Sequence, residues 1–257
     1  RRYMSESSVP TELALRVQHY LDFAWRMREH RLLEDNVEVL GLLSTALRVQ
    51  LNTAIFEPRI SVHPLFVLIG KMAAFIMQRL CNTAVTRLFS IQGDSLFSVN
   101  TKMSKMFVIF SGELEYQLDE SGKPEQVKPG VWVCEPALWT EWSTYGALVA
   151  LTDCEIVSVD ATCFGDAVKM ADEIWCEAVH YARGFVQGLN RIDKSRLTDL
   201  FHSNLIEGLW FRLLNDWNVR SRPTLQNGID FEGRGSTISI AGNMMAVPGA
   251  GLKKVEE

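Results

Sequence analysis

The chain has 257 residues, of which 47% are hydrophobic and 22% are charged, and its formal net charge is −5. This composition is that of a globular protein with one large or two small domains, and the acidic balance disfavours nucleic-acid binding, which Lys and Arg dominate. The five cysteines include no C-x-x-C pair, so buried thiols in a reducing compartment are expected instead of a disulfide framework or a zinc site.

The first 65 residues are expected to be helical. Ser8, Pro10 and Glu12 indicate a helix start. Apolar residues then follow at helical spacing: Leu13, Val17, Tyr20, Leu21 and Ala24. Further helices are predicted around Leu40 and over residues 45–56, and prolines at 58 and 64 close the region. Such short helices need a partner surface for their apolar faces.

A helix is predicted from Pro64 to about Leu80, and the pattern then changes. Between Thr83 and Asp160, short apolar runs alternate with turn residues such as Gly93 and the Pro129-Gly130 pair. The predicted strands lie at residues 85–91, 96–97, 107–110, 114–118, 131–133, 147–151 and 156–159. Six to eight short antiparallel strands favour a jelly-roll-like β-roll.

Helices are predicted to return at Asp160 or Ala161. A long amphipathic helix continues to about Asn190, and a Leu-rich helix is expected from about Ser195 to Trp217. Residues 220–257 have no clear period and are expected to be a mostly disordered tail. The sequence therefore predicts an α+β chain with four parts: a helical region (1–65), a β-roll with flanking and capping helices (66–192), an additional helix (193–219) and the tail (220–257).

Several short segments, in this order, carry a resemblance to a known family. They are residues 9–20 (VPTELALRVQHY), Trp25, 40–47 (LGLLSTAL), 63–66 (HPLF), 93–97 (GDSLF), 106–116 (MFVIFSGELEY) and 129–130 (PG). Together they resemble the C-linker plus cyclic-nucleotide-binding homology domain of the cyclic-nucleotide-gated, hyperpolarization-activated and ether-à-go-go cation channel superfamily. The resemblance covers roughly residues 3–190, and its C-linker half distinguishes it from soluble cyclic-nucleotide-binding proteins.

The resemblance implies a function, a location and a set of partners. The chain would be a regulatory gating module of a voltage-gated-like cation channel, potassium-selective or non-selective, at the cytoplasmic face of a membrane. The helical C-linker would form a homo-tetrameric ring below a transmembrane pore domain that this chain lacks. No nucleic-acid partner, metal or catalytic residue is expected, and the protein would not be an enzyme.

The resemblance also implies a ligand site, the phosphate cassette, in which a Glu contacts the ribose and an Arg pairs with the cyclic phosphate. Here Glu135 aligns with the ribose carboxylate, but Cys134 replaces a Gly, Pro136 removes a backbone donor and Thr144 stands at the Arg position. Losing such a buried charge pair costs about 2–5 kcal/mol, or on the order of 30- to several-thousand-fold in affinity. Cyclic AMP or cyclic GMP should bind weakly or not at all.

Other residues could contact a ligand or fill the pocket. Tyr145 and Arg183 are the remaining candidate ligand contacts, and Trp139 and Trp142 are candidates to plug the pocket with side chains. Each has an ordinary structural alternative as a turn residue, a solvated helix face or core packing. Two other functions stay open: a cyclic-nucleotide sensor with an altered cassette, and a non-channel interaction protein that uses a ligand-free β-roll.

Overall fold

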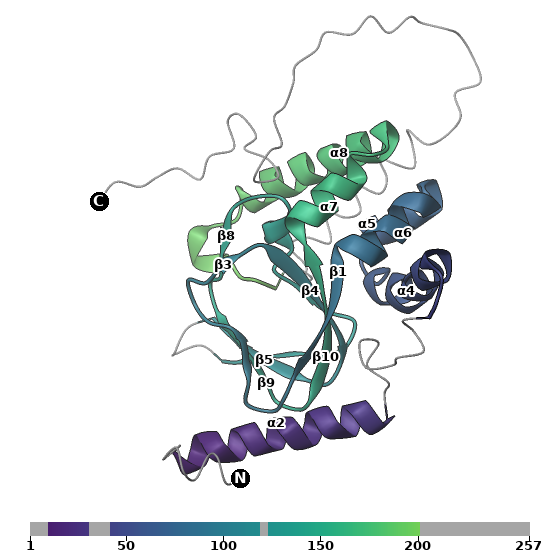
Figure 1. The fold of residues 1–257 in the computed structure, drawn as a ribbon. Helices are drawn as coiled ribbons and strands as arrows, with labels where there is room; N and C mark the ends of the chain where they lie inside the picture. Colours follow the sequence, from purple (N-terminus) through teal and green to yellow (C-terminus); the bar gives the residue numbers. More distant parts are fainter. Residues whose placement is uncertain (1–9, 31–41, 119–122, 201–257) are drawn as a thin grey trace, which may run out of the picture.

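The structure is a computed structural model that describes residues 10–30, 42–118 and 123–200. The chain has the predicted α+β fold, in which helices precede and follow an antiparallel β-roll (Figure 1). The predicted tail and much of the helix predicted around Leu40 lie outside the described residues.

The first two described helices are α2 (Thr11–His30) and α4 (Thr45–Ile60). Ser44 caps α4, because its hydroxyl accepts from the Leu47 amide at 3.3 Å. The sequence predicted the end of this helix at residue 56, but the helix continues to Ile60 and includes Pro58. Figure 1 shows α2 across the end of the roll near β5 and β9, and an exposed ion pair joins Arg16 to Asp94 at 3.0 Å.

The single helix predicted from Pro64 to Leu80 is two helices, α5 (Pro64–Met72) and α6 (Ala74–Thr83). They meet at Ala73, whose φ of −148° and ψ of 84° are not helical. The sequence did not reveal this break, because apolar residues recur at helical spacing on both sides of Ala73. His63 caps α5, since its Nδ1 accepts from the Leu65 amide at 3.3 Å.

The roll consists of two four-stranded antiparallel sheets and one two-stranded pair. The first sheet has the order β1 (Val85–Ser90), β10 (Cys154–Asp160), β4 (Lys105–Ser111) and β7 (Trp132–Val133). The second has the order β2 (Ser95–Phe97), β9 (Ala147–Ala150), β5 (Leu114–Gln117) and β6 (Glu125–Val127). The pair is β3 (Lys102–Met103) with β8 (Trp142–Ser143). This arrangement confirms the predicted roll.

Three helical elements follow the roll. Asp160 caps α7 (Ala161–Val168) by accepting from two amides at 3.0 Å. Then come α8 (Asp172–Leu189) and the short 3-10 turn η3 (Lys194–Arg196). In Figure 1, α7 and α8 lie over one end of the roll, on the same side as α5 and α6.

The helix predicted from Ser195 onward is wrong over residues 197–200. After η3, Leu197 has an extended backbone (φ −69°, ψ 137°), and no helix continues to residue 200. The physical reason is that Leu197 and Leu200 enter different clusters of the core: Leu197 packs between the helices and the roll, and Leu200 packs inside the roll. The rest of the predicted helix lies outside the described residues.

Candidate functional site

The cassette loop, residues 134–146, leads from β7 to β9 and begins in a strained conformation. Cys134 has a left-handed backbone (φ 58°, ψ 32°), which costs a residue with a Cβ about 1–2 kcal/mol. This is the position at which the resemblance expects Gly. Residues Glu135–Leu138 follow as the 3-10 turn η2. Gly adopts this conformation without a steric penalty, so the chain makes with Cys134 a turn that usually favours Gly.

The first candidate ligand residue, Glu135, is completely buried beneath the helices. Its Oε1 accepts from the Tyr181 hydroxyl at 2.5 Å and from the Trp139 indole at 3.4 Å, and its Oε2 accepts from the Trp132 indole at 3.0 Å. His63 Nε2 lies 3.3 Å from Oε1. We call these five residues the Glu135 cluster. It joins η2 to the start of α5 and to the middle of α8.

Electrostatics favour an ionised Glu135. Burial alone would raise the pKa of this carboxyl, but the charge and hydrogen bond of His63 and the bonds from Tyr181 and Trp132 outweigh it, so the pKa lies below its usual value. The two ring nitrogens of His63 face different groups: Nδ1 lies 3.3 Å from the Leu65 amide, and Nε2 lies 3.3 Å from Glu135 Oε1. Burial and the Glu135 charge in turn raise the pKa of Tyr181 well above its usual value.

These contacts make Glu135 an internal anchor. The side chains that surround it belong to the protein itself and come from four separate segments of the fold. A ribose hydroxyl would have to compete with them for the carboxylate oxygens. The ribose contact stays a prediction, and a ligand would form it only by displacing one of these side chains from the carboxylate.

A second buried carboxylate, Asp199, was not among the predicted site residues. It belongs to residues 197–200, which we call the inserted segment, and its side chain is fully buried. The carboxylate oxygen Oδ2 accepts from the amides of Tyr145 and Gly146, both at 2.9 Å, and from the Tyr116 hydroxyl at 2.8 Å. Oδ1 accepts from the Trp142 indole at 2.7 Å. Two successive amides of the cassette loop therefore hold an anion supplied by the chain itself.

The main chain of Asp199 is held as well. Its amide donates to the Tyr116 hydroxyl at 3.1 Å, and its carbonyl accepts from the Cys134 amide at 2.9 Å. Asp199 thus makes six hydrogen bonds with the roll, four through its carboxylate and two through its backbone. The first residue of the cassette loop, Cys134, is thus joined to the inserted segment through its amide.

The four groups that donate to the Asp199 carboxylate are all uncharged. Burial raises the pKa of this carboxyl, and the bonds from Gly146, Trp142, Tyr116 and Tyr145 offset the shift only in part. Burial and the nearby Asp199 charge also raise the pKa of Tyr116. Asp199 is consequently held by geometry and hydrogen bonding, without the opposing charge that a phosphate-binding Arg would supply.

Thr144, at the expected Arg position, has another task in the structure. It is buried, and its hydroxyl donates to the Ser98 carbonyl at 2.5 Å and accepts from the Thr101 amide at 2.9 Å. It thereby fixes the turn between β2 and β3. Its neighbour Tyr145 contributes its backbone amide to the Asp199 site. A direct ligand contact by either residue stays a prediction.

The two candidate plug residues occupy different places. Trp139 is fully buried and packs against Phe164 and Tyr181, with ring centroids 5.6 and 5.3 Å apart. It belongs to the layer between helices and roll. Trp142 packs against Tyr145 at 5.2 Å and donates to Asp199. Of the two, Trp142 therefore lies at the Asp199 site, where it holds the inserted segment.

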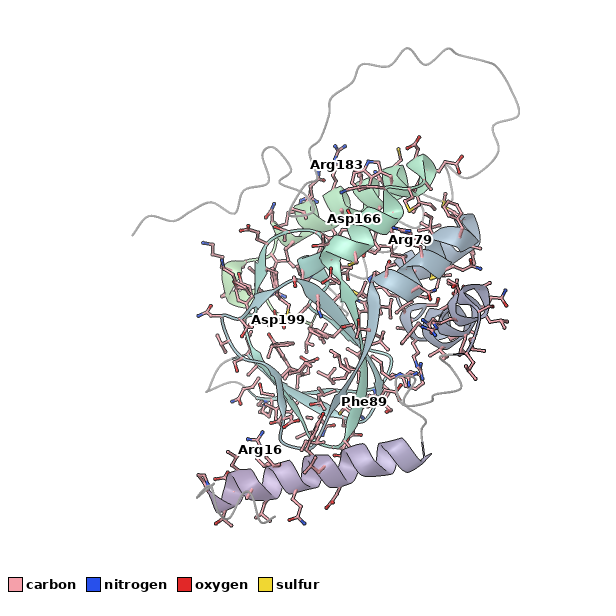
Figure 2. The ribbon with its side chains drawn as sticks, viewed as in Figure 1. Arg16, Arg79, Phe89, Asp166, Arg183 and Asp199 are labelled. Carbon is pink, nitrogen blue, oxygen red and sulfur yellow. The ribbon has the colours of Figure 1, made fainter. Side chains whose placement is uncertain are left out.

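Arg183, the last candidate, is exposed on α8. Figure 2 shows it on α8, well separated from Asp199 at the roll. The structure therefore groups Tyr145 and Trp142 around Asp199, groups Glu135 and Trp139 around Tyr181, and places Arg183 apart from both sites.

Sequence reasoning missed Asp199, Tyr116, His63 and Tyr181. The one available signal was His63-Pro64, which the sequence marks as a helix start and which places a His side chain at a helix cap. Asp199 had no signal, because a lone acid between leucines in a Leu-rich run is typical of an amphipathic helix. Its role depends on residues 116, 142, 145 and 146, which are far away in the sequence.

Other clusters in the described residues are structural. Arg59 and Arg87 lie 3.1 and 3.3 Å from the buried Glu155, which ties α4 to the first sheet. In the described ranges, no group of three or more His, Cys, Asp or Glu side chains could hold a metal ion. No helix among the described residues is long and apolar enough to cross a membrane.

The chain is similar to many solved structures, with 376 matching chains. The chain is similar to a cyclic nucleotide-binding-like protein from Brucella abortus, with 19% sequence identity and a TM-score of 0.36; the match covers 40% of this chain and 90% of that chain. No family model and no curated protein matches the chain. The functional proposal therefore depends on this chain's own residues.

Proposed function

We propose that this chain is a non-enzymatic regulatory domain whose β-roll has the form of a cyclic-nucleotide-binding domain but is occupied by its own inserted segment. The observation that carries the proposal is the Asp199 carboxylate on the amides of Tyr145 and Gly146. Paired main-chain amides are a usual anion site in proteins, and here an acidic side chain takes the place of a ligand phosphate.

A tethered ligand has a large advantage over a free one. A segment joined to its own site by a short linker has an effective concentration of roughly millimolar or more. A cyclic nucleotide would have to displace this segment and would find no Arg or Lys between positions 128 and 169 of the sequence. Strong binding of cyclic AMP or cyclic GMP is therefore not expected.

The sequence resemblance supplies the wider setting of the proposal. We place the domain at the cytoplasmic face of a membrane, as the gating module of a voltage-gated-like cation channel, potassium-selective or non-selective. Helices such as α2 and α4 would form a four-fold ring with other copies. The inserted segment, docked or released, would be the two-state element, and any ligand could act only by preferring one of the two states.

Calorimetry on the purified chain tests the occupied roll. Cyclic AMP and cyclic GMP are titrated to millimolar concentration into the wild-type chain and into Asp166→Ala, which removes a carboxylate whose side chain is 66% exposed on α7. No binding heat is expected from either protein. Micromolar binding to the wild-type chain would overturn the proposal and favour the nucleotide-sensor alternative.

The channel setting has a separate test. Sequencing of the complete transcript that encodes this chain should reveal, upstream of it, an apolar region long enough for six membrane-spanning helices. A transcript without such a region would remove the channel from the proposal and leave an interaction protein with an occupied roll.

A further inference from the structure

The inserted segment is held like a peptide ligand. Asp199 forms hydrogen bonds with the roll through its side chain, its amide and its carbonyl. The inserted segment is extended at Leu197, bends at Asp199 and is not paired into either four-stranded sheet. Main-chain hydrogen bonds combined with specific side-chain sites are how folded domains recognise extended peptides.

The site distinguishes a carboxylate from its closest neutral relative. Three donors converge on Oδ2, and the Trp142 indole N–H points at Oδ1. An Asn side chain could offer one oxygen to the three donors, but its NH2 group would then face the Trp142 N–H, donor against donor. Only an acid of this length provides an acceptor at both positions.

Two apolar side chains flank the acid and fix the sequence that the site accepts. Leu197 is 4% exposed and belongs to the core between helices and roll, whereas Leu200 is 3% exposed and belongs to the core inside the roll. Thr198 is only partly buried. The roll therefore reads a four-residue pattern of apolar, variable, Asp, apolar.

We propose that the roll is a peptide-recognition site, and that an extended segment of another protein with this pattern binds it in place of residues 197–200. The inference rests on the proposed function, because it requires that the chain's own segment is a removable occupant. The partner is defined by its chemistry: an acidic residue flanked by apolar side chains at the spacing of Leu197 and Leu200. Its binding would displace the inserted segment and would be the regulatory input of the domain.

The test uses the whole chain with its own ligand weakened. A fluorescein-labelled peptide with the sequence of residues 193–203 is titrated, by fluorescence anisotropy, with wild-type chain, Asp199→Ala and Asp166→Ala. Binding to Asp199→Ala should be at least about tenfold tighter than to the wild-type chain, whose tethered segment competes. Asp166→Ala should behave as the wild-type chain does.

The same titration, with a peptide that carries Asp199→Asn, tests whether the site requires an acidic side chain at this position. It should bind the Asp199→Ala chain about tenfold or more weakly than the acidic peptide, because hydrogen bonds to a charged group are lost. Circular dichroism checks that each chain is folded. If Asp199→Ala does not fold, the chain with Asp199→Asn, which keeps the shape of the side chain, replaces it.

The outcomes separate the two proposals. Equal affinity for the two peptides, or no peptide binding by a folded variant, overturns the peptide inference and leaves the occupied roll in place. Binding of cyclic AMP, but not of peptide, by Asp199→Ala also overturns it in favour of a nucleotide. Micromolar cyclic AMP binding by the wild-type chain instead overturns the proposed function.

Discussion

Glu135 and Asp199 are two fully buried carboxylates that meet the same cassette loop in opposite ways. Glu135 belongs to the loop, lies next to His63 and has a lowered pKa. Asp199 comes from a segment more than fifty positions later, meets only uncharged donors and has a raised pKa. His63 lies beside the Glu135 carboxylate and helps to offset the cost of its burial, whereas the Asp199 carboxylate depends on hydrogen bonds from uncharged groups alone.

Under the proposed function, Glu135 has a structural role and Asp199 has a regulatory role. The Glu135 cluster connects α5, η2 and α8, so its loss would disturb the contacts that place the helices on the roll. The inserted segment follows η3 and is paired into neither four-stranded sheet, although Leu200 packs inside the roll. In the proposed released state the segment would leave, and the strands and helices would keep their own backbone hydrogen bonds. A domain with one fixed and one removable carboxylate can change state without unfolding.

The largest expected effect comes from Glu135→Ala. This change leaves the donors of Tyr181, Trp132 and His63 buried without their acceptor, and we expect the free energy of unfolding to fall by about 3–5 kcal/mol. Urea denaturation followed by circular dichroism measures it. The matched change Glu125→Ala, at an exposed position on β6, should alter stability by less than about 0.5 kcal/mol. A loss below about 1 kcal/mol at Glu135 would contradict its role as an anchor.

Asp199→Ala should have a smaller effect on stability and a large local one. We expect a loss of about 2–3 kcal/mol, because released donors can regain water once the segment leaves. Trypsin should then cut faster after the exposed Lys194 and Arg196, next to the segment. Mass spectrometry of timed digests follows both sites. Unchanged cleavage rates, compared with Asp166→Ala, would show that the segment is held by contacts other than Asp199.

Tyr116→Phe tests one donor of the Asp199 site. The hydroxyl donates to Oδ2 at 2.8 Å and accepts from the Asp199 amide at 3.1 Å, so its removal should cost about 1–2 kcal/mol in unfolding free energy. The control Tyr20→Phe, in which the tyrosine is 47% exposed on α2, should cost almost nothing. Equal urea midpoints for the two variants would argue against a structural role of the Tyr116 hydroxyl.

The smallest expected effect is the pH dependence of the unfolding free energy, which should have opposite signs for the two carboxylates. The pKa of Asp199 is raised in the folded state, so its contribution to stability is largest below its unfolded pKa of about 3.9 and declines as the pH rises through the folded value. The pKa of Glu135 is lowered, so its contribution is present above its unfolded pKa of about 4.3 and is lost as the pH falls through the folded value.

Unfolding free energies from pH 3 to pH 8 measure both contributions as differences from the wild-type chain. The difference for Asp199→Asn should shrink as the pH rises, and the difference for Glu135→Gln should shrink as the pH falls. Slopes of the same sign for the two variants would show that the two carboxylates do not differ as their surroundings indicate.

Local patterns in the sequence predicted most of the elements correctly. Helix α2 was predictable because its apolar residues recur at helical spacing, and the longer strands β4 and β10 because each is a mostly apolar run that is buried on both faces. The strands β3, β6 and β8 have only two or three residues. They were missed because each contains a single apolar residue, whereas the equally short β2 and β7 contain two adjacent ones.

The candidate site shows the same limit. Glu135 was found because it occupies a motif position, but its four partners come from positions 63, 132, 139 and 181. Asp199 was hidden in a Leu-rich run that favours a helix on local grounds. Six hydrogen bonds and two separate apolar sites for Leu197 and Leu200 override that preference.

The sequence by itself determined the α+β class, the order of helices and roll, and the absence of Arg and Lys between positions 128 and 169, because these features follow directly from periodicity and residue identity. Only the tertiary structure decided which anion occupies the cassette amides and which carboxylate is fixed. Those outcomes depend on distances between groups far apart in the chain, and such distances exist only after folding.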